Sequence, residues 1–210
     1  MGDLPELAAP SGAAGRVAVE SALRAAGRSA RFSGWTLADA DLSGLELAGC
    51  EFLRCRAARA DFRSADLTEA RFKGCDLNNT RWRGARLPAA TFVDCKLTGA
   101  QFLEIAALGL SFAGCLLVSA GLRGISFRRC EVEDVDFQGA DLAGCDFREA
   151  VLIRCNLREA HVAEARFEGA DLRGADLGTL RLADASRFKG AIISKHQAGQ
   201  LLAGLGLKVV

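Results

Sequence analysis

A large apolar side chain returns at every fifth residue from Arg31 to Asp184, and this period constrains the fold more than any other feature of the sequence. These residues have numbers ending in 2 or 7, and only Ala57 and Ala107 among them are small. A second set, at numbers ending in 0 or 5, is mostly Ala or Cys. A period of five fits neither a helix nor a strand, so the chain must turn a corner every five residues. Because so short a repeat cannot bury its own apolar face, successive coils must stack.

The repeat has the form Ala-(Asp or Asn)-(Leu or Phe)-x-x, as in Ala-Asp-Leu-Ser-Gly at residues 40–44 and Ala-Asp-Leu-Arg-Gly at residues 170–174. It resembles the pentapeptide-repeat family over about three quarters of the chain. The resemblance implies an all-β solenoid, a right-handed quadrilateral β-helix over residues 31–190 with four pentads per coil and about eight coils. Residues twenty apart then lie above one another, which predicts two aromatic columns, one of Phe32, Phe52, Phe72, Phe92 and Phe112 and one of Phe127, Phe147 and Phe167.

Residues 1–30 lack the repeat and are rich in Ala and Gly. Residues Arg16 to Ala26 are compatible with a short helix, and the alternative is a loose tail. An open solenoid end exposes core and strand edges. We therefore predict a partly ordered cap over the first coil, with a flexible segment as the alternative.

Residues 191–210 form a separate C-terminal segment. Ser194 and Gln197 have the spacing of a capping box, which predicts a helix start, and residues 207–210 predict a short strand. The stretch from His196 to Val210 resembles the C-terminal module of the Qnr and mycobacterial fluoroquinolone-resistance branch of the family. There it is implied to join two copies head to head, which predicts a homodimer through Leu201, Leu202, Leu205, Leu207, Val209 and Val210. The alternative is a cap folded back on the last coil of a monomer.

Several function classes receive no support from the sequence. No apolar run approaches the roughly 18 residues of a membrane span. The acidic start lacks the layout of a secretory signal, so we expect a cytoplasmic protein. All eight cysteines occupy the small-residue positions, which predicts buried thiols rather than disulfides or a zinc site. The two histidines have no ligand-like neighbours, and the glycines recur at the corners. We predict no enzyme, no metal and no cofactor.

One part of the repeat carries apolar residues at positions that elsewhere point to solvent. They are Leu103, Leu108, Leu116 and Val118. An exposed apolar patch of this kind predicts a surface for a protein partner, although single exposed leucines are common.

Charge is unevenly distributed along a chain whose net charge is +1. Residues 81–129 carry a net charge of +5 and residues 130–184 a net charge of −7. If the C-terminal ends met in a dimer, the acidic halves would adjoin in an acidic belt that includes Glu131, Asp134, Asp136, Asp141, Asp146, Asp171 and Asp176. Such a belt can occupy a groove built for DNA by presenting carboxylates in place of phosphates. The alternative is an ordinary solvated surface, and direct binding of nucleic acid is not expected.

The resemblance to the fluoroquinolone-resistance branch implies a DNA-mimicking protein. Such a protein binds a type II topoisomerase, DNA gyrase or topoisomerase IV, and confers resistance to quinolones or to a natural-product inhibitor. The unbroken repeat leaves no room for the loops of Qnr proteins, which is closer to the mycobacterial type, where inhibition of gyrase is implied. The alternative is a structural or adaptor solenoid that presents a flat face to an unrelated protein.

Overall fold

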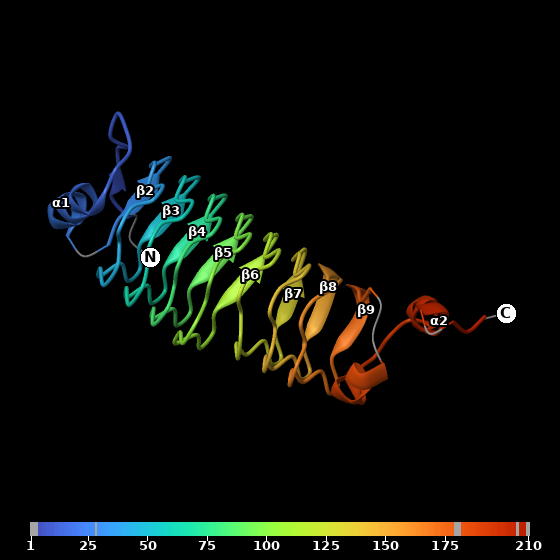
Figure 1. The fold of residues 1–210 in the computed structure, drawn as a ribbon. Helices are drawn as coiled ribbons and strands as arrows, with labels where there is room; N and C mark the ends of the chain where they lie inside the picture. The colour runs from blue at the N-terminus through green and yellow to red at the C-terminus, as the bar shows by residue number, and fades with distance from the viewer. Residues whose placement is uncertain (1–3, 28, 179–181, 205, 209–210) are drawn as a thin grey trace. The chain divides into compact units, whose positions relative to one another are not determined.

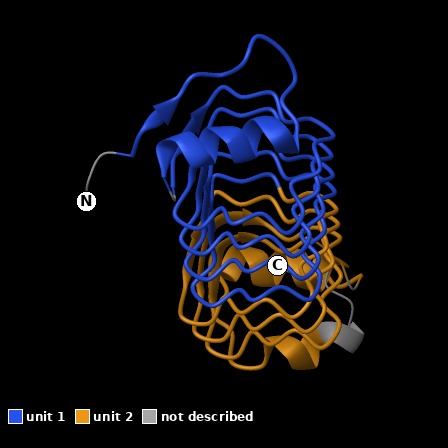
Figure 2. Cartoon of the chain, turned by 90° about the vertical axis from the view of Figure 1, so that its left-hand side faces the viewer, with its two compact units in different colours: residues 1–116 blue, residues 117–210 orange. Residues whose placement is uncertain are grey.

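The computed structural model describes residues 4–27, 29–178, 182–204 and 206–208. The chain divides into two compact units, Met1–Leu116 and Leu117–Val210, which Figure 2 colours separately. Each unit is built from the same parallel β-solenoid, and the chain makes about seven turns rather than the predicted eight. No helix among the described residues is long and apolar enough to span a membrane.

The described residues of the first unit form six short strands and one helix (Figure 1). Each strand pairs in parallel with the next, and from β2 onward the partners are twenty residues apart, as in Phe52 with Phe72. Four pentads therefore complete one turn, as the repeat predicts. The elements are β1 (Glu6–Leu7), α1 (Arg16–Ala26), β2 (Arg31–Ser33), β3 (Glu51–Leu53), β4 (Arg71–Lys73), β5 (Thr91–Val93) and β6 (Ser111–Ala113).

In the second unit, the described residues form three strands in the same pattern, followed by helices. Val132 pairs with Leu152 in the same twenty-residue register, and the pairing of β8 with β9 contains register shifts. The elements are β7 (Glu131–Glu133), β8 (Val151–Asn156), β9 (Asp171–Asp176), the 3₁₀ helix η1 (Leu182–Phe188) and α2 (Lys195–Gly204).

The backbone conformation at the corners between pentads recurs every five residues, which explains why the sequence keeps this period. From residue 34 to residue 169, the second residue after each large apolar residue has a positive φ, in the left-handed region. Gly74 adopts this conformation with a φ of 63°, but so does Glu69 with a φ of 58°. The corner therefore requires a left-handed backbone at every repeat, although glycine fills only some of these positions. Each non-glycine corner costs about 1–2 kcal/mol, which the hydrogen bonds between coils must offset.

Stacked aromatic rings fill the core, and both predicted columns are present. Neighbouring rings from Phe32 to Phe112 are 4.7–5.2 Å apart and nearly parallel. In the second unit Phe127, Phe147 and Phe167 stack at 4.7 and 4.8 Å. A further column of Phe62, Trp82 and Phe102 meets the first one edge to face. This third column was not among those predicted.

A buried hydroxyl satisfies the one polar atom of the Trp82 ring. Thr80 accepts a hydrogen bond of 2.8 Å from Trp82 Nε1 and donates one of 2.7 Å to the carbonyl of Leu77. Thr80 and Trp82 are both fully buried. Within the described residues no buried side-chain nitrogen or oxygen atom lacks a partner.

The solenoid ends at η1, which replaces a regular eighth turn. Phe188 comes one residue later than the period requires, yet its ring stacks on Phe167 at 4.5 Å. The 3₁₀ helix absorbs the extra residue, since the carbonyl of Arg187 still accepts the N–H of Phe167. Ile192 then pairs with Asp171 as a further coil would. A short strand was predicted for residues 207–210. Leu207 and Lys208 do not form one, and residues 209–210 lie outside the described part.

The N-terminal segment covers the first coil. Strand β1 pairs with β2, and Ala13 forms a bridge to Thr36 on the next face. Helix α1 forms over Arg16–Ala26, where the sequence left helix and tail open, and its Val19 is fully buried. Trp35 donates a hydrogen bond of 3.1 Å to the carbonyl of Leu7.

Candidate functional site

The aspartate at the second position of the repeat has a structural role. Its Oδ1 accepts the backbone N–H two residues later, at 2.9–3.2 Å, which closes the turn in the manner of an Asx turn. The repeat therefore selects Asp here because its short side chain can reach this amide. The residues that make this bond are Asp41, Asp61, Asp66, Asp76, Asp136, Asp141, Asp146, Asp171 and Asp176.

This role accounts for most of the predicted acidic belt. Five of its seven members, from Asp136 to Asp176, are turn-closing aspartates. The other two are Glu131, which is exposed in β7, and Asp134, which occupies a corner. The carboxylates of the acidic belt are therefore partly committed to the fold itself.

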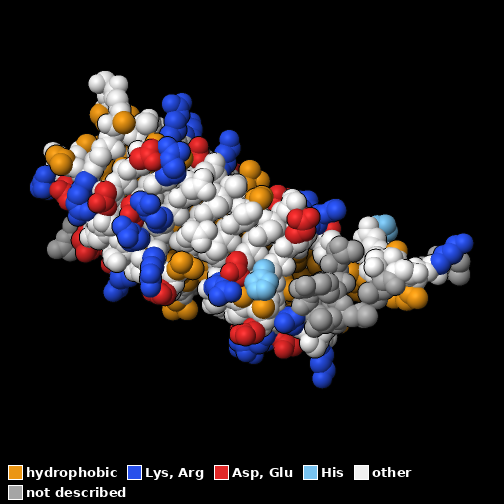
Figure 3. Space-filling model, viewed as in Figure 1, with side chains coloured by type: hydrophobic (Ala, Val, Ile, Leu, Met, Phe, Trp, Pro, Cys, Tyr) orange, Lys and Arg blue, Asp and Glu red, His pale blue; other side chains and the backbone are white. Residues whose placement is uncertain are grey.

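Arginines further neutralise the acidic belt. Among the described residues, only Glu131 and Asp136 of its seven members form no ion pair. Figure 3 accordingly shows basic and acidic side chains next to one another on the visible face. The ion pairs are Asp134 with Arg154, Asp141 with Arg123, Asp146 with Arg148 and Arg166, Asp171 with Arg173, and Asp176 with Arg158.

Asp146 is the most strongly held of these carboxylates. Its side chain is 13 % exposed and lies 2.7 Å from Arg148 and 3.0 Å from Arg166. The hydrogen bonds from Arg148 and the charges of both arginines lower the pKa of Asp146 to about 2. Asp61 repeats the arrangement in the first unit, between Arg63 and Arg81.

Replacing Asp146 with asparagine is expected to destabilise the protein at neutral pH but not at pH 2. Because its folded pKa is lowered, Asp146 contributes stability that is present above its unfolded pKa and is lost as pH falls through about 2. The contribution is at most about 2 kcal/mol. Urea unfolding of Asp146→Asn and the wild type should therefore differ at pH 7 and converge between about pH 4 and pH 2.

The control is Asp176→Asn, which should change the free energy of unfolding little at either pH, because the carboxylate of Asp176 is 52 % exposed. A pH-independent difference would contradict this account.

The three members of the predicted apolar patch that lie in the first unit, Leu103, Leu108 and Leu116, do not form one surface. Leu108 is 86 % exposed beside Ala89, while Leu116 is 44 % exposed and pairs with Lys96. Two corners separate Leu108 from Leu116, so they lie on opposite sides of a four-sided coil. Leu103 is half-buried, and Val118 is half-buried in the second unit. Leu108 and Leu116 are thus two separate exposed leucines rather than parts of one patch.

The C-terminal helix is fixed to the last coil by a polar side chain. Ser194 and Gln197 form the predicted capping box, with bonds of 2.7 and 3.2 Å. The side chain of Gln197 is also buried and donates bonds of 2.7 Å to the carbonyls of Leu172 and Ala175. The capping box indicated only the first of these two roles.

The predicted dimer residues are only partly described. Leu201 is half-buried, whereas Leu202 and Leu207 are exposed. Leu205, Val209 and Val210 lie outside the described residues. Ile192 and Ile193, which directly precede the capping box, add two exposed apolar side chains that were not among the predicted interface residues.

The cysteines pack as small core residues. Seven of the eight are buried, Cys130 is half-buried, and all eight are free thiols. Burial raises the pKa of Cys145 to about 12 and that of Cys155 to about 11, which keeps both thiols protonated and unreactive at neutral pH. In the described part of the chain, no group of three or more His, Cys, Asp or Glu side chains is arranged to hold a metal ion.

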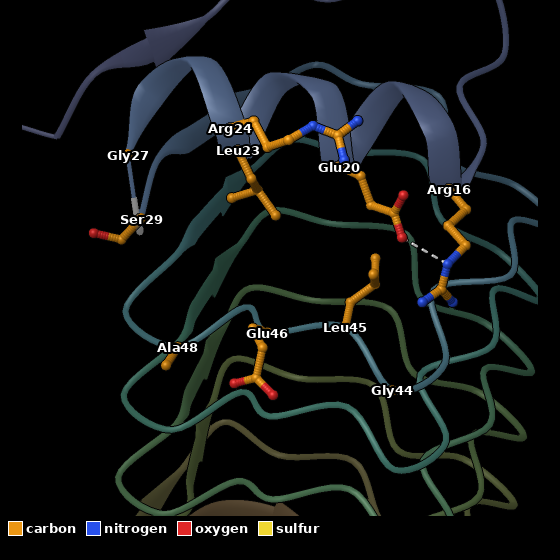
Figure 4. Close-up of a pocket in the computed structure, with 10 residues that line it drawn as sticks. All are labelled: Arg16, Glu20, Leu23, Arg24, Gly27, Ser29, Gly44, Leu45, Glu46 and Ala48. Carbon is orange, nitrogen blue, oxygen red and sulfur yellow. Dashed lines mark hydrogen bonds and ion pairs between the residues drawn. The ribbon is translucent and has the colours of Figure 1, made fainter.

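A cleft of about 800 Å³ lies between α1 and the first coil (Figure 4). Leu23 projects into it from the helix and Leu45 from the coil. Charged side chains of both signs, including Arg16, Arg24 and Glu46, complete the lining. This cleft was not predicted from the sequence, because it depends on how α1 lies over the coil.

Two family models match the part of the chain that carries the five-residue repeat. A model described as a pentapeptide repeat region matches residues 28–102, and one described as pentapeptide repeats in eight copies matches residues 130–162 and 150–186. A comparison with curated proteins finds no match.

Two solved structures of QnrB1, described as a plasmid-mediated fluoroquinolone resistance protein, are similar to this chain. A trypsin-treated variant is 25% identical with a TM-score of 0.54, covering 86% of this chain and 90% of its own. The full-length protein is 22% identical with a TM-score of 0.57, covering 85% and 88%. These similarities confirm the predicted right-handed β-helix. Together with the two models that match on either side of residues 103–129, the twenty-residue register and the stacked core establish that the chain belongs to the pentapeptide-repeat family.

Proposed function

We propose that this chain is a non-catalytic protein that binds a type II topoisomerase, DNA gyrase or topoisomerase IV, and protects it from poisons such as fluoroquinolones. The observation that carries the proposal is the similarity to the fluoroquinolone resistance protein QnrB1 over 86% of this chain and 90% of the other. The exposed apolar residues Leu202 and Leu207 support a homodimer through the C-terminal segment.

The ion pairs change how such binding would work. A DNA mimic needs carboxylates that are free to face basic residues of its partner. The exposed acids of the second unit that form no ion pair with a described residue are Glu131, Glu159, Glu164 and Glu168. We therefore assign the electrostatic part of binding to these glutamates rather than to the turn-closing aspartates of the acidic belt.

An adaptor solenoid that binds an unrelated protein is the second candidate. It is favoured by the extent of charge pairing, since five of the seven members of the acidic belt already form ion pairs within the chain. A surface neutralised in this way has little net field with which to imitate a phosphate backbone.

The test is a gyrase supercoiling assay with purified protein, with and without a fluoroquinolone, at two salt concentrations. We expect inhibition at high protein or rescue from the drug at low protein, and both effects should weaken as salt rises. The double variant Glu131→Lys and Glu164→Lys should weaken the effect about tenfold. The matched control is Glu69→Lys with Asp94→Lys, which reverses two exposed acids of the first unit and should leave the effect unchanged. No effect of the folded wild type in any arm would favour the adaptor.

A further inference from the structure

One face of the first coil presents backbone groups that no other described part of the chain uses. In the next coil, Asp66 donates its N–H to the carbonyl of Leu45 at 2.9 Å and accepts the N–H of Leu47 at 2.7 Å. The equivalent residue one coil earlier is Glu46. Its N–H and carbonyl, and the carbonyl of Ala48, have no hydrogen-bond partner among the described residues. This edge is therefore an open strand edge.

The N-terminal segment supplies at least one hydrogen-bond partner to each of the other faces of the same coil. Arg31 donates its N–H to the carbonyl of Pro5 at 2.9 Å, and Ala14 donates to Thr36 at 2.7 Å. On the third face, the guanidinium of Arg16 donates to the carbonyl of Ser43 at 2.6 Å. Asp41 on the third face also has no backbone hydrogen-bond partner among the described residues, so the face of Glu46 is distinguished by the cleft that lies over it.

Helix α1 lies over this open edge, and the cleft is between the two (Figure 4). The hydrogen bond from the guanidinium of Arg16 to the carbonyl of Ser43 fixes the N-terminal end of α1 to the coil. At the other end the chain returns at Ser29 close to Gly49, where a Cβ would lie 3.7 Å from that of Ser29. Between these two ends the cleft of about 800 Å³ has Leu23 and Leu45 as apolar walls. A strand rises about 3.3 Å per residue, so an extended segment of a few residues could lie along the edge between these two ends.

The charges in the cleft indicate the chemistry of the occupant. Arg16 and Glu20 pair with each other at 2.8 Å. Arg24 and Glu46 form no ion pair with any residue that the structure describes. At the pentad position of Glu46, neighbouring coils elsewhere place a cation over an anion, as in the pairs Arg31–Glu51 at 2.8 Å and Arg86–Asp66 at 3.5 Å. A basic side chain over Glu46 would complete the same arrangement.

We propose that this cleft binds an extended peptide segment of a partner protein, which adds a strand to the edge at Glu46–Ala48. The backbone of the peptide takes up the free N–H and carbonyl groups, a basic side chain lies over Glu46, and an apolar side chain enters between Leu23 and Leu45. The cleft holds two cations and two anions, so it does not favour nucleic acid. The proposal concerns the first unit alone and does not depend on a topoisomerase partner.

The test begins with a phage-displayed library of linear heptapeptides selected on the immobilised full-length protein. We expect enriched peptides that share a basic residue followed by an apolar one. The selected peptide should bind Glu46→Lys about tenfold more weakly, as expected for the loss of one charge-assisted contact. In the free protein the Glu46 N–H should exchange rapidly with solvent, and the peptide should slow its exchange at least about tenfold.

Glu69→Lys is the matched control, because Glu69 is an exposed acid at the corner that ends the equivalent face one coil later, forms no ion pair in the described structure and does not line the cleft. It should bind the selected peptide as the wild type does. The proposal is overturned if no peptide is enriched, if Glu46→Lys and Glu69→Lys bind it equally well, or if the Glu46 N–H is already protected without it.

Discussion

Replacing Phe72 with alanine is expected to lower the free energy of unfolding by about 3–5 kcal/mol, the largest effect of any single substitution considered for this protein. Phe72 lies at the centre of the aromatic core and is 1% exposed. Its ring stacks on Phe52 at 4.7 Å and on Phe92 at 4.8 Å. It also meets Phe62 and Trp82 edge to face. The substitution removes both stacked and edge contacts, which adds to the loss of buried apolar area.

The cavity left by Phe72→Ala cannot collapse, because backbone hydrogen bonds between successive coils fix the coils above and below it. Arg71 donates to the carbonyl of Cys50 at 2.9 Å, and Thr91 donates to Ala70 at 3.0 Å. Denaturant unfolding followed by circular dichroism measures the effect. Leu108→Ala is the control, since a leucine that is 86 % exposed should contribute within about 0.5 kcal/mol. A loss below about 1 kcal/mol for Phe72→Ala would mean that the stack can repack around the gap.

Much of the fold could be predicted because the repeat determines both the inward positions and the register. Once residues twenty apart are placed above one another, the columns from Phe32 and from Phe127 follow directly. The column of Phe62, Trp82 and Phe102 obeys the same rule and was equally accessible. Phe188 was not, because its place on Phe167 depends on η1, whose length the period does not specify.

The candidate surfaces were harder to predict, since net charge ignores pairing. Residues 130–184 have a net negative charge, yet most carboxylates of the acidic belt close turns or pair with an arginine. The register contains part of this information, because Arg154 stands twenty residues after Asp134 and Arg166 twenty after Asp146. The pairs between Asp146 and Arg148, or Asp171 and Arg173, depend instead on side-chain direction at a corner, which no periodicity gives.

Replacing Gln197 with alanine is expected to release α2 from the last coil, with a local cost of about 2–4 kcal/mol. The substitution leaves the carbonyls of Leu172 and Ala175 without the donors that reach them at 2.7 Å. It also removes the bond of 2.7 Å that the Gln197 side chain accepts from the N–H of Ser194. Because α2 can detach from the coil, the loss should appear as faster amide exchange in residues 195–204 rather than as global unfolding.

This local release also tests the assignment of the dimer to the C-terminal segment. If the exposed side chains of Leu202 and Leu207 form the interface, a detached α2 should shift the protein from dimer to monomer in sedimentation experiments. Gln200→Ala is the matched control, because Gln200 lies on the same helix but is exposed, and it should preserve both amide protection and the dimer. Gln197→Ala protein with mobile α2 amides that remained dimeric would place the interface elsewhere. Unchanged amide exchange would instead show that apolar contacts of Leu201, rather than the buried amide of Gln197, hold the helix in place.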